Sequence, residues 1–331
     1  MTFSWTIPLR LPAVVHLVPP PPEPSRLRVI VPTFRDWPEA RLTVEGLLAC
    51  SPQPAEIVLV DDNGGGQLPR WARRAGIRLV RYQGNRGPAF ARNAGLALAS
   101  QRAIEWIHFT DTGCLRPTDF FARFADEATR SRTTPVAFAA PVRGRGVSHR
   151  RTPINAYMTE EEILNPPRDA DGPQAIITAN AFVSVAALAR TGGFRTDFPF
   201  AAAEDLDLGL RLRHLGRIDW LTRSVVTHPF PEAIADFDRR FERYGRGNAH
   251  LQHVWRLPTL RVPRFLAASP DLQWLADRQV AAMNLGFDAH LASIRERRVV
   301  LGPSRGVLSM WDGRSRGVRL PLGGGAAADF A

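Results

Sequence analysis

Acidic residues follow three short apolar runs in the first half of the sequence, each within a segment of polar and turn-forming residues. The segments are Pro32–Asp36, Asp61–Gly66 and Thr110–Gly113. A carboxylate can accept hydrogen bonds from a polar ligand, and it can bind a hard divalent cation. One acid after a strand is often only a turn residue or a helix cap. Three in succession on one edge of a sheet favour a ligand-binding site.

The elements that would position these acids alternate along the chain between short apolar runs and amphipathic segments. Strands are predicted at Leu27–Val31, Glu56–Val60, Ile77–Tyr82 and Trp106–Phe109, and helices at Glu39–Ala49, Gln67–Ala75 and Pro88–Ser100. Such alternation indicates an α/β fold with a doubly wound, mostly parallel open sheet flanked by helices. Ligands of these sheets bind at the carboxyl ends of the strands, where the acids lie. Without a GxGxxG or Walker pattern, a dinucleotide-binding or P-loop fold is disfavoured.

The composition is that of an ordinary globular protein, except that its basic residues are all of one type. The 331 residues contain no lysine, so all 43 basic residues are arginine, and the formal net charge is +11. The arginines are scattered and no basic run is interleaved with aromatic residues, which argues against a nucleic-acid partner. A phosphate-rich small ligand, or a loose contact with an anionic membrane surface, remains compatible with this charge.

The cysteines and apolar runs indicate neither a disulfide framework nor a membrane span. Cys50 and Cys114 do not form a CxxC pair. The longest apolar candidate, Ala175–Ala189, is interrupted by polar residues and is too short to cross a bilayer. The N-terminus lacks a basic signal segment. We therefore expect a cytoplasmic protein, with peripheral contact at the inner face of the membrane as the alternative.

Four ordered motifs resemble glycosyltransferase family 2, whose members have the GT-A fold. They are VIVPTFRDWPEARLTVEGLLACSPQPAEIVLVDDNG, NRGPAFARNAGLALA, IHFTDTGCLRP and TANAFVSVAALARTGGFRTDFPFAAAEDLDLGLRLRHLG, between Leu27 and His228. The resemblance implies an inverting transferase that uses a nucleotide-diphosphate-sugar donor, with a UDP-sugar favoured, and usually a divalent cation, Mn²⁺ or Mg²⁺. It places the catalytic domain at residues 27–255, after a Pro-rich extension at 1–26.

The resemblance also implies roles for residues at the first two strand ends and the following helix. Pro32, Thr33 and Arg35 would lie beside the nucleotide base, and either Asp61 or Asp62 would accept a hydrogen bond from it. The helix that begins near Gly87 would bind the diphosphate. Its candidate residues are Gly87, Arg92 and Asn93, because a helix N-terminus and a guanidinium both suit phosphate.

The third motif departs from the family, which usually carries Asp-x-Asp at this place. Here the sequence is Asp111, Thr112 and Gly113, so one of the two acids expected to bind the metal is absent. Three alternatives remain open. Asp111 and His228 together bind the metal, Asp111 contacts only the ribose, or arginines such as those of residues 143–151 stabilise the leaving group without a metal.

The second half of the resemblance carries the chemistry. Glu204 and Asp205 begin an amphipathic segment at residues 201–216, where two acids are favoured electrostatically whatever their function. In the family such a pair supplies the catalytic base, and by position Asp205 is the candidate. Asn180, Gly193 and Phe194 match positions near the sugar and the acceptor, although a structural amide explains Asn180 equally well.

The remaining segments are less familiar. Residues 143–174 lack periodicity and are expected to form a lid or an acceptor loop. An arginine-rich helix is predicted at Ile234–Trp255, further helices at Leu272–Arg297 within a C-terminal extension of residues 256–331, and a flexible tail at its end. The acceptor, whether a glycan, a lipid-linked sugar, a peptide or a small molecule, is not specified. A catalytically silent nucleotide-sugar-binding scaffold is the alternative function.

Overall fold

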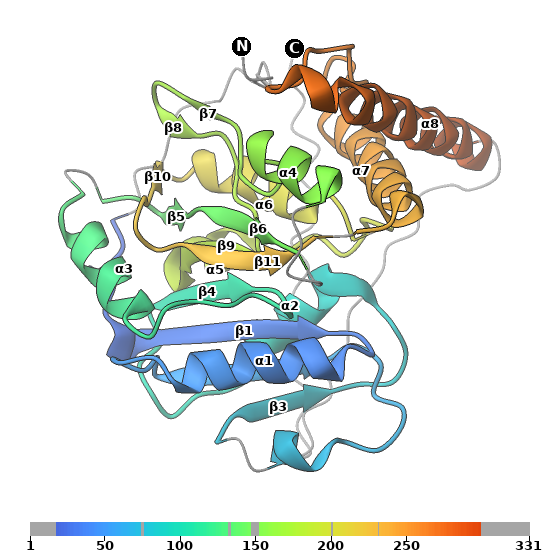
Figure 1. Ribbon diagram of the computed structural model, residues 1–331. Helices are drawn as coiled ribbons and strands as arrows, with labels where there is room; N and C mark the ends of the chain where they lie inside the picture. The colour runs from blue at the N-terminus through green and yellow to red at the C-terminus, as the bar shows by residue number, and fades with distance from the viewer. Residues whose placement is uncertain are drawn as a thin grey trace.

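A seven-stranded sheet in the order β10-β5-β9-β4-β1-β2-β3 forms the centre of the computed structural model (Figure 1). The structure describes residues 18–73, 76–131, 134–146, 152–199, 201–230 and 232–298. The strands of this sheet are β1 Leu27–Thr33, β2 Glu56–Asp61, β3 Arg78–Arg81, β4 Trp106–Thr110, β5 Ala137–Ala139, β9 Asn180–Ser184 and β10 Ile218–Trp220. Two short pairs lie outside it, namely β6 Val142–Arg145 with β11 Val226–Pro229, and β7 Arg168–Asp169 with β8 Gly172–Pro173.

Helices cover both faces of the sheet. The α-helices are α1 Trp37–Leu48, α2 Gly87–Ala97, α3 Phe120–Thr129, α4 Pro153–Glu160, α5 Val185–Thr191, α6 Glu204–Arg213, α7 Ile234–Trp255 and α8 Gln273–Arg298. Short 3₁₀ turns occur at Pro24–Arg26, Arg70–Arg73 and Pro270–Leu272. The predicted α/β class with a mostly parallel sheet is confirmed, with β9 antiparallel to both β4 and β5.

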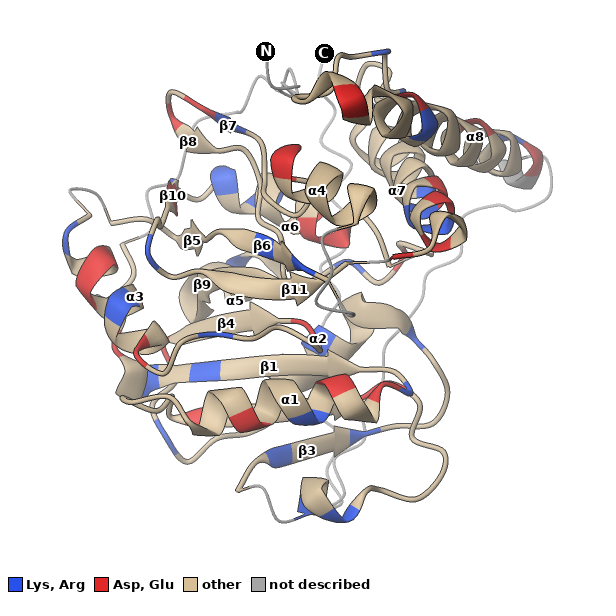
Figure 2. Ribbon diagram, in the orientation of Figure 1, with Lys and Arg blue, Asp and Glu red and all other residues tan. Residues whose placement is uncertain are grey.

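The alternation of apolar side chains along β1 explains the three layers. Leu27, Val29 and Val31 pack on the face covered by α1 and α3, whereas Ile30 packs on the face covered by α2, α5 and α6. Successive residues of a strand point to opposite faces, so a strand buried on both sides is apolar throughout. In Figure 2 the charges lie mainly on the surrounding helices and loops, and the central strands are largely tan.

Parallel pairing brings the three acidic segments to one edge, as predicted. Thr33 pairs with Asp61 at the ends of β1 and β2, and Ile30 pairs with Phe109 one residue before the end of β4. The polar segments that follow these strands therefore lie together at the carboxyl edge of the sheet.

Several sequence expectations are corrected. The helix predicted at Gln67–Ala75 is wrong for the described part of that range, because residues 67–69 are not helical and Arg70–Arg73 form a short 3₁₀ turn after Pro69. The stretch 143–174 is only partly a loop, since its described residues include β6, α4, β7 and β8. The helix at Ile234–Trp255 is confirmed, and α8 accounts for the predicted C-terminal helices. The start of the Pro-rich extension, residues 147–151 and the tail lie outside the described residues.

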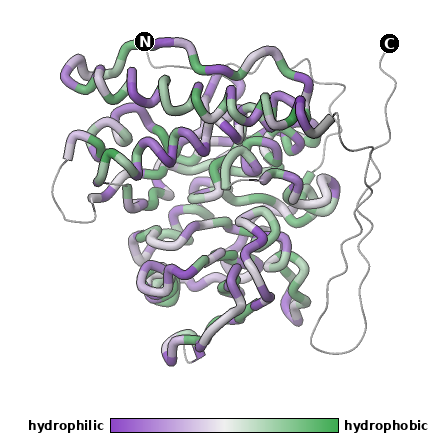
Figure 3. The backbone as a smooth tube through the Cα atoms, turned by 90° about the vertical axis from the view of Figure 1, so that its right-hand side faces the viewer, coloured by the Kyte–Doolittle hydropathy of each residue, from purple (hydrophilic) through white to green (hydrophobic). Residues whose placement is uncertain are grey.

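The helices α7 and α8 pack against each other along their length and adjoin the sheet domain (Figure 1). Two glycines make the close approach feasible. A Cβ atom on Gly245 would lie 1.8 Å from the carbonyl oxygen of Met283, and one on Gly286 would lie 1.9 Å from that of Glu242. In the turned view of Figure 3 the helices at the top alternate between hydrophilic and hydrophobic residues, as expected for amphipathic helices.

Cys50 and Cys114 are buried free thiols, consistent with the absence of a disulfide framework. Within the described ranges, no helix combines the length and the apolar character that a membrane span requires.

Candidate active site

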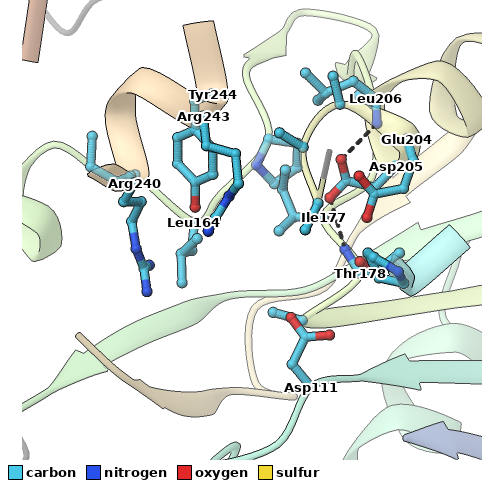
Figure 4. A pocket seen from close by; sticks show the side chains of 18 of the residues that line it. Asp111, Leu164, Ile177, Thr178, Glu204, Asp205, Leu206, Arg240, Arg243 and Tyr244 are labelled. Carbon is cyan, nitrogen blue, oxygen red and sulfur yellow. Dashed lines mark hydrogen bonds between the residues drawn. The ribbon is translucent and has the colours of Figure 1, made fainter. Parts of the chain in front are cut away.

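A cavity of about 720 Å³ opens at the carboxyl edge of the sheet. The strand ends form one side of it, and α6, α7, α8 and the segment after α4 form the other (Figure 4). The predicted site residues that line it are Pro32, Thr33, Asp62, Arg92, Asp111, Glu204, Asp205 and His228. Residues from all four motifs therefore meet in one cavity.

The end of β1 presents a small set of groups to this cavity. Thr33 is buried, and its hydroxyl has no hydrogen-bond partner within the described part of the chain. Phe34, which the sequence did not single out, lines the cavity with 41% of its surface exposed. An orphaned hydroxyl beside an exposed aromatic ring suits a planar polar ligand such as a nucleotide base. Arg35 does not line the cavity and instead donates from Nε to Asn63 at 3.4 Å.

Only one of the two candidate acids at the end of β2 lines the cavity. Asp62 lines it and accepts hydrogen bonds from the Tyr82 hydroxyl at 2.8 Å and from the backbone N–H groups of Arg86 and Gly87 at 2.7 and 2.8 Å. Burial raises the pKa of Asp62, and these hydrogen bonds oppose the shift. Asp61 does not line the cavity, and its Oδ2 atom accepts a hydrogen bond from Arg81 Nε at 2.9 Å.

Gly87 thus positions Asp62 through its backbone N–H rather than turning that group toward a ligand. It begins α2 with a φ of 83°, a backbone conformation that glycine adopts readily.

Arg92 connects the two halves of the candidate site. Its guanidinium donates from Nη2 to Asp111 Oδ1 and from Nη1 to Glu204 Oε1, both at 2.9 Å, and only 3% of the residue is exposed. Burial lowers the pKa of Arg92, but neighbouring carboxylates more than offset this and raise it overall. Arg92 therefore holds two acids on one guanidinium, Asp111 directly after β4 and Glu204 at the start of α6.

Glu204 and Asp205 begin α6 directly after Ala203, whose φ is 68°. Asp205 accepts from the backbone N–H of Leu206 at 2.9 Å and of Thr178 at 3.4 Å, as drawn in Figure 4. Burial, together with the negative charge of Glu204, raises the pKa of Asp205 to about 7, although Arg92 opposes the shift. A carboxyl with this pKa can exchange a proton near neutral pH.

The absence of a second acid from the third motif has a structural explanation. Gly113 has a φ of 80°, and a Cβ atom there would lie 2.6 Å from Glu39 Oε2 and 2.7 Å from the Pro229 ring. Glu39 is itself paired with Arg145 at 2.8 Å. A side chain at position 113 would therefore be strained by the backbone and crowded by Glu39 and Pro229.

His228 lines the cavity from β11, and its Nδ1–H donates to the carbonyl oxygen of Pro229 at 2.6 Å. Burial lowers the pKa of His228 to about 4, and the nearby Asp111 opposes this shift. The imidazole is therefore neutral, and the lone pair lies on Nε2. Within the described ranges, no group of three or more acidic, histidine or cysteine side chains forms a complete metal site. Asp111 and His228 both line the cavity, and a carboxylate and a neutral imidazole are ligand types that Mn²⁺ accepts.

The sugar and acceptor candidates Asn180, Gly193 and Phe194 do not line the cavity. The Asn180 side-chain amide donates to the carbonyls of Pro141 and Ser224 at 2.9 and 2.8 Å, so its observed contacts are structural. Asn93 lies outside the lining as well. Its amide donates to the Phe194 carbonyl at 2.7 Å and accepts from the Phe194 N–H at 2.9 Å, which fastens the glycine turn to α2.

In the wall opposite the strand ends, sequence reasoning did not identify the arginines that face the cavity. Arg240, Arg243 and Tyr244 of α7 line the cavity (Figure 4), and the Nε atom of Arg243 is buried with no hydrogen-bond partner within the described ranges. The predicted arginine-rich helix contained these residues, but only the packing of α7 shows which of its arginines face the cavity.

Comparisons with known proteins find two family models and solved structures that are similar to this chain. The model described as glycosyl transferase family 2 matches residues 28–190, and the model described as glycosyl transferase family group 2 matches residues 115–293. A mannosyltransferase from Pyrobaculum calidifontis, solved with GDP-mannose and Mn²⁺, has a TM-score of 0.53 at 19% identity, over 89% of this chain and 80% of that chain. Residues 1–349 of TarS from S. aureus, solved with UDP, have a TM-score of 0.46 at 16% identity, over 82% and 92% of the two chains. A search of curated proteins finds no match.

Proposed function

The chain belongs to glycosyltransferase family 2, and on that premise we propose that it moves a sugar, with inversion, from a nucleotide-diphosphate donor to an acceptor hydroxyl. Asp205 is the general base of this proposal. The observation that carries it is the position of Asp205, in the same cavity as the strand-end residues and with its pKa raised to about 7.

The donor half of the cavity is assigned to the strand ends. Thr33 offers an unused hydroxyl and Asp62 a carboxylate to the base, and the exposed ring of Phe34 offers a stacking surface. The solved mannosyltransferase from P. calidifontis holds GDP-mannose, and TarS holds UDP. For this chain a UDP-sugar is the donor we favour, with Asp62 rather than Asp61 as the acid that contacts the base.

In the proposed reaction, Asp205 takes the proton of the acceptor hydroxyl as the hydroxyl oxygen bonds to the anomeric carbon. The bond from that carbon to the diphosphate oxygen breaks on the opposite face, so the anomeric configuration inverts. Arg92 holds Glu204 beside Asp205, and the negative charge of Glu204 makes Asp205 a stronger base.

A divalent cation would be held by Asp111 and His228, whose carboxylate and neutral imidazole suit Mn²⁺. When bound, it would neutralise charge that develops on the diphosphate. Arg240 provides the alternative, because it lines the same cavity and lies close enough to His228 to lower the pKa of that residue.

The first test measures donor binding by the thermal stability of the purified protein. Uridine, guanosine, thymidine and cytidine diphosphates are compared with and without Mn²⁺, because a ligand that binds only the folded state raises the melting temperature. We expect the largest increase with uridine diphosphate. A further increase with Mn²⁺ supports the Asp111–His228 metal site. An increase that is the same with and without Mn²⁺ supports Arg240 as the group that replaces the metal. No increase with any nucleotide would refute the donor assignment.

The second test is the Asp205→Asn variant. Loss of the general base is expected to slow transfer by a factor of about 10²–10⁴, with nucleotide binding retained. Asp197→Asn is the matched control, since Asp197 lies before the same helix, pairs with Arg195 and does not line the cavity. Loss of nucleotide binding together with activity in Asp205→Asn would contradict the assigned role.

A further inference from the structure

The cavity has a second half whose chemistry differs from that of the strand ends. Residues of α7, α8 and the segments between elements form its wall, and we call this the apolar chamber. It is lined by Leu164, Ile177, Phe241, Leu251, Phe265 and Met283. Figure 4 shows Ile177 between the α7 side chains and the Glu204–Asp205 pair, with Leu164 below Arg243 and Tyr244.

We propose that the apolar chamber binds the acceptor, and that the acceptor carries a compact apolar body, an aromatic ring or a short alkyl chain, next to the hydroxyl that is glycosylated. This inference rests on the proposed function. It deepens that function by assigning a chemical class to the second substrate.

The position of Asp205 indicates which half of the cavity binds the donor and which binds the acceptor. A general base must contact the acceptor hydroxyl, while the sugar lies between that hydroxyl and the departing diphosphate. With the donor assigned to the strand ends, the acceptor must approach Asp205 from the other half of the same cavity. The apolar chamber occupies that half.

The wall of the chamber also carries polar groups, of which Gln279 is already paired within the protein. Gln279 already accepts a hydrogen bond from the Tyr157 hydroxyl at 2.8 Å, and its amide nitrogen lies 3.8 Å from the sulfur of Met283. A ligand rich in hydroxyl groups would lose hydrogen bonds to water on entering such a wall, whereas an apolar body gains from leaving water.

The test compares three glucosides that differ only in the group on the anomeric oxygen. Phenyl, octyl and methyl β-D-glucoside are titrated into the protein with uridine diphosphate present, and binding is followed by calorimetry. Phenyl or octyl glucoside is expected to bind at least about tenfold more tightly than methyl glucoside, because burial of a few apolar groups is enough for such a gain in affinity. Tighter binding of the phenyl compound identifies an aromatic acceptor, and tighter binding of the octyl compound an alkyl one.

Two variants locate the binding. Phe265→Ala and Tyr244→Ala, at residues that line the cavity, should each remove most of the preference for the apolar glucosides. Leu266→Ala is the control, because Leu266 follows directly but is 79% exposed. An increased melting temperature with uridine diphosphate shows that each variant is folded. Equal affinity for all three glucosides, or an unchanged preference in both variants, would overturn the proposal. Nucleotide binding that persists beside such a result would leave the proposed function intact.

Discussion

Arg92 is the residue on which the geometry of the candidate site most depends. It lies between Asp111 and Glu204, and its side chain and that of Glu204 are almost fully buried. Removing one member of a buried ionic cluster leaves the others uncompensated, so we expect Arg92→Gln to lower the free energy of unfolding by about 3–5 kcal/mol. Urea denaturation measures this change.

The control is Arg41→Gln, which removes an exposed pair with Glu45 one helical turn away. Its expected cost is at most about 0.5 kcal/mol. Similar costs for the two variants would mean that Arg92 has no special role in holding the acids.

The charge of Glu204 should set the pH dependence of the reaction. As the proposed base, Asp205 would act only when ionised, so activity is expected to rise with pH through its pKa of about 7. Glu204→Gln removes a negative charge that raises this pKa, and the rising limb should therefore move to lower pH. A profile of kcat/KM against pH measures the shift. An unchanged limb, or a move to higher pH, would contradict the coupling of the two acids.

The same pKa has a consequence for stability. Because the folded protein holds a proton on Asp205 over a pH range in which the unfolded chain has lost it, this group lowers stability as pH rises from about 4 to 7. Asp205→Asn should remove that part of the pH dependence.

At the scale of elements, the contact between α7 and α8 depends on glycine. A Cβ atom at position 286 would collide with the Glu242 carbonyl, so Gly286→Ala must separate the helices or bend one of them. We expect a loss of stability of more than about 1 kcal/mol. Gly46→Ala in α1 is the matched control, since nothing lies within 4 Å of its added methyl group. There the substitution should stabilise the protein by about 0.5–1 kcal/mol. The free energies of unfolding of both variants, measured by denaturation, test whether α7 and α8 pack as closely as described.

The sequence was informative about elements and less so about contacts between them. The apolar runs before Asp61 and Asp111 predicted strands whose ends meet, because parallel pairing follows from the alternation of strands and helices. Asn180 could not be assigned in advance, since its amide partners belong to distant loops. Nor could Arg243 be distinguished from other arginines of α7, because the face that reaches the cavity is set by packing against α8 and the sheet domain.

The whole molecule is strongly cationic, and its donor is proposed to be an anion. A net charge of +11 should speed the approach of a nucleotide diphosphate, and salt should screen this effect. We expect the apparent Kd for uridine diphosphate to increase several-fold as NaCl rises from roughly 20 to 500 mM.

Arg240→Gln should reduce the salt dependence, since Arg240 lines the cavity. Arg223→Gln is the control, because Arg223 pairs with Asp126 outside the cavity. Equal salt dependence in both variants would indicate a diffuse effect of net charge rather than a local one.

The crowding around Gly113 also limits how the site can change. An aspartate introduced there would need a relaxed backbone, a displaced Glu39 and a repositioned Pro229, and moving Glu39 would in turn release Arg145. Each of these changes alone is disfavoured, so a two-acid site is separated from the present sequence by intermediates of lower stability. A site with Asp111 as its single acid is therefore expected to persist unless several residues change together. Laboratory selection for stronger metal dependence should recover substitutions at positions 39 and 229 before any at 113.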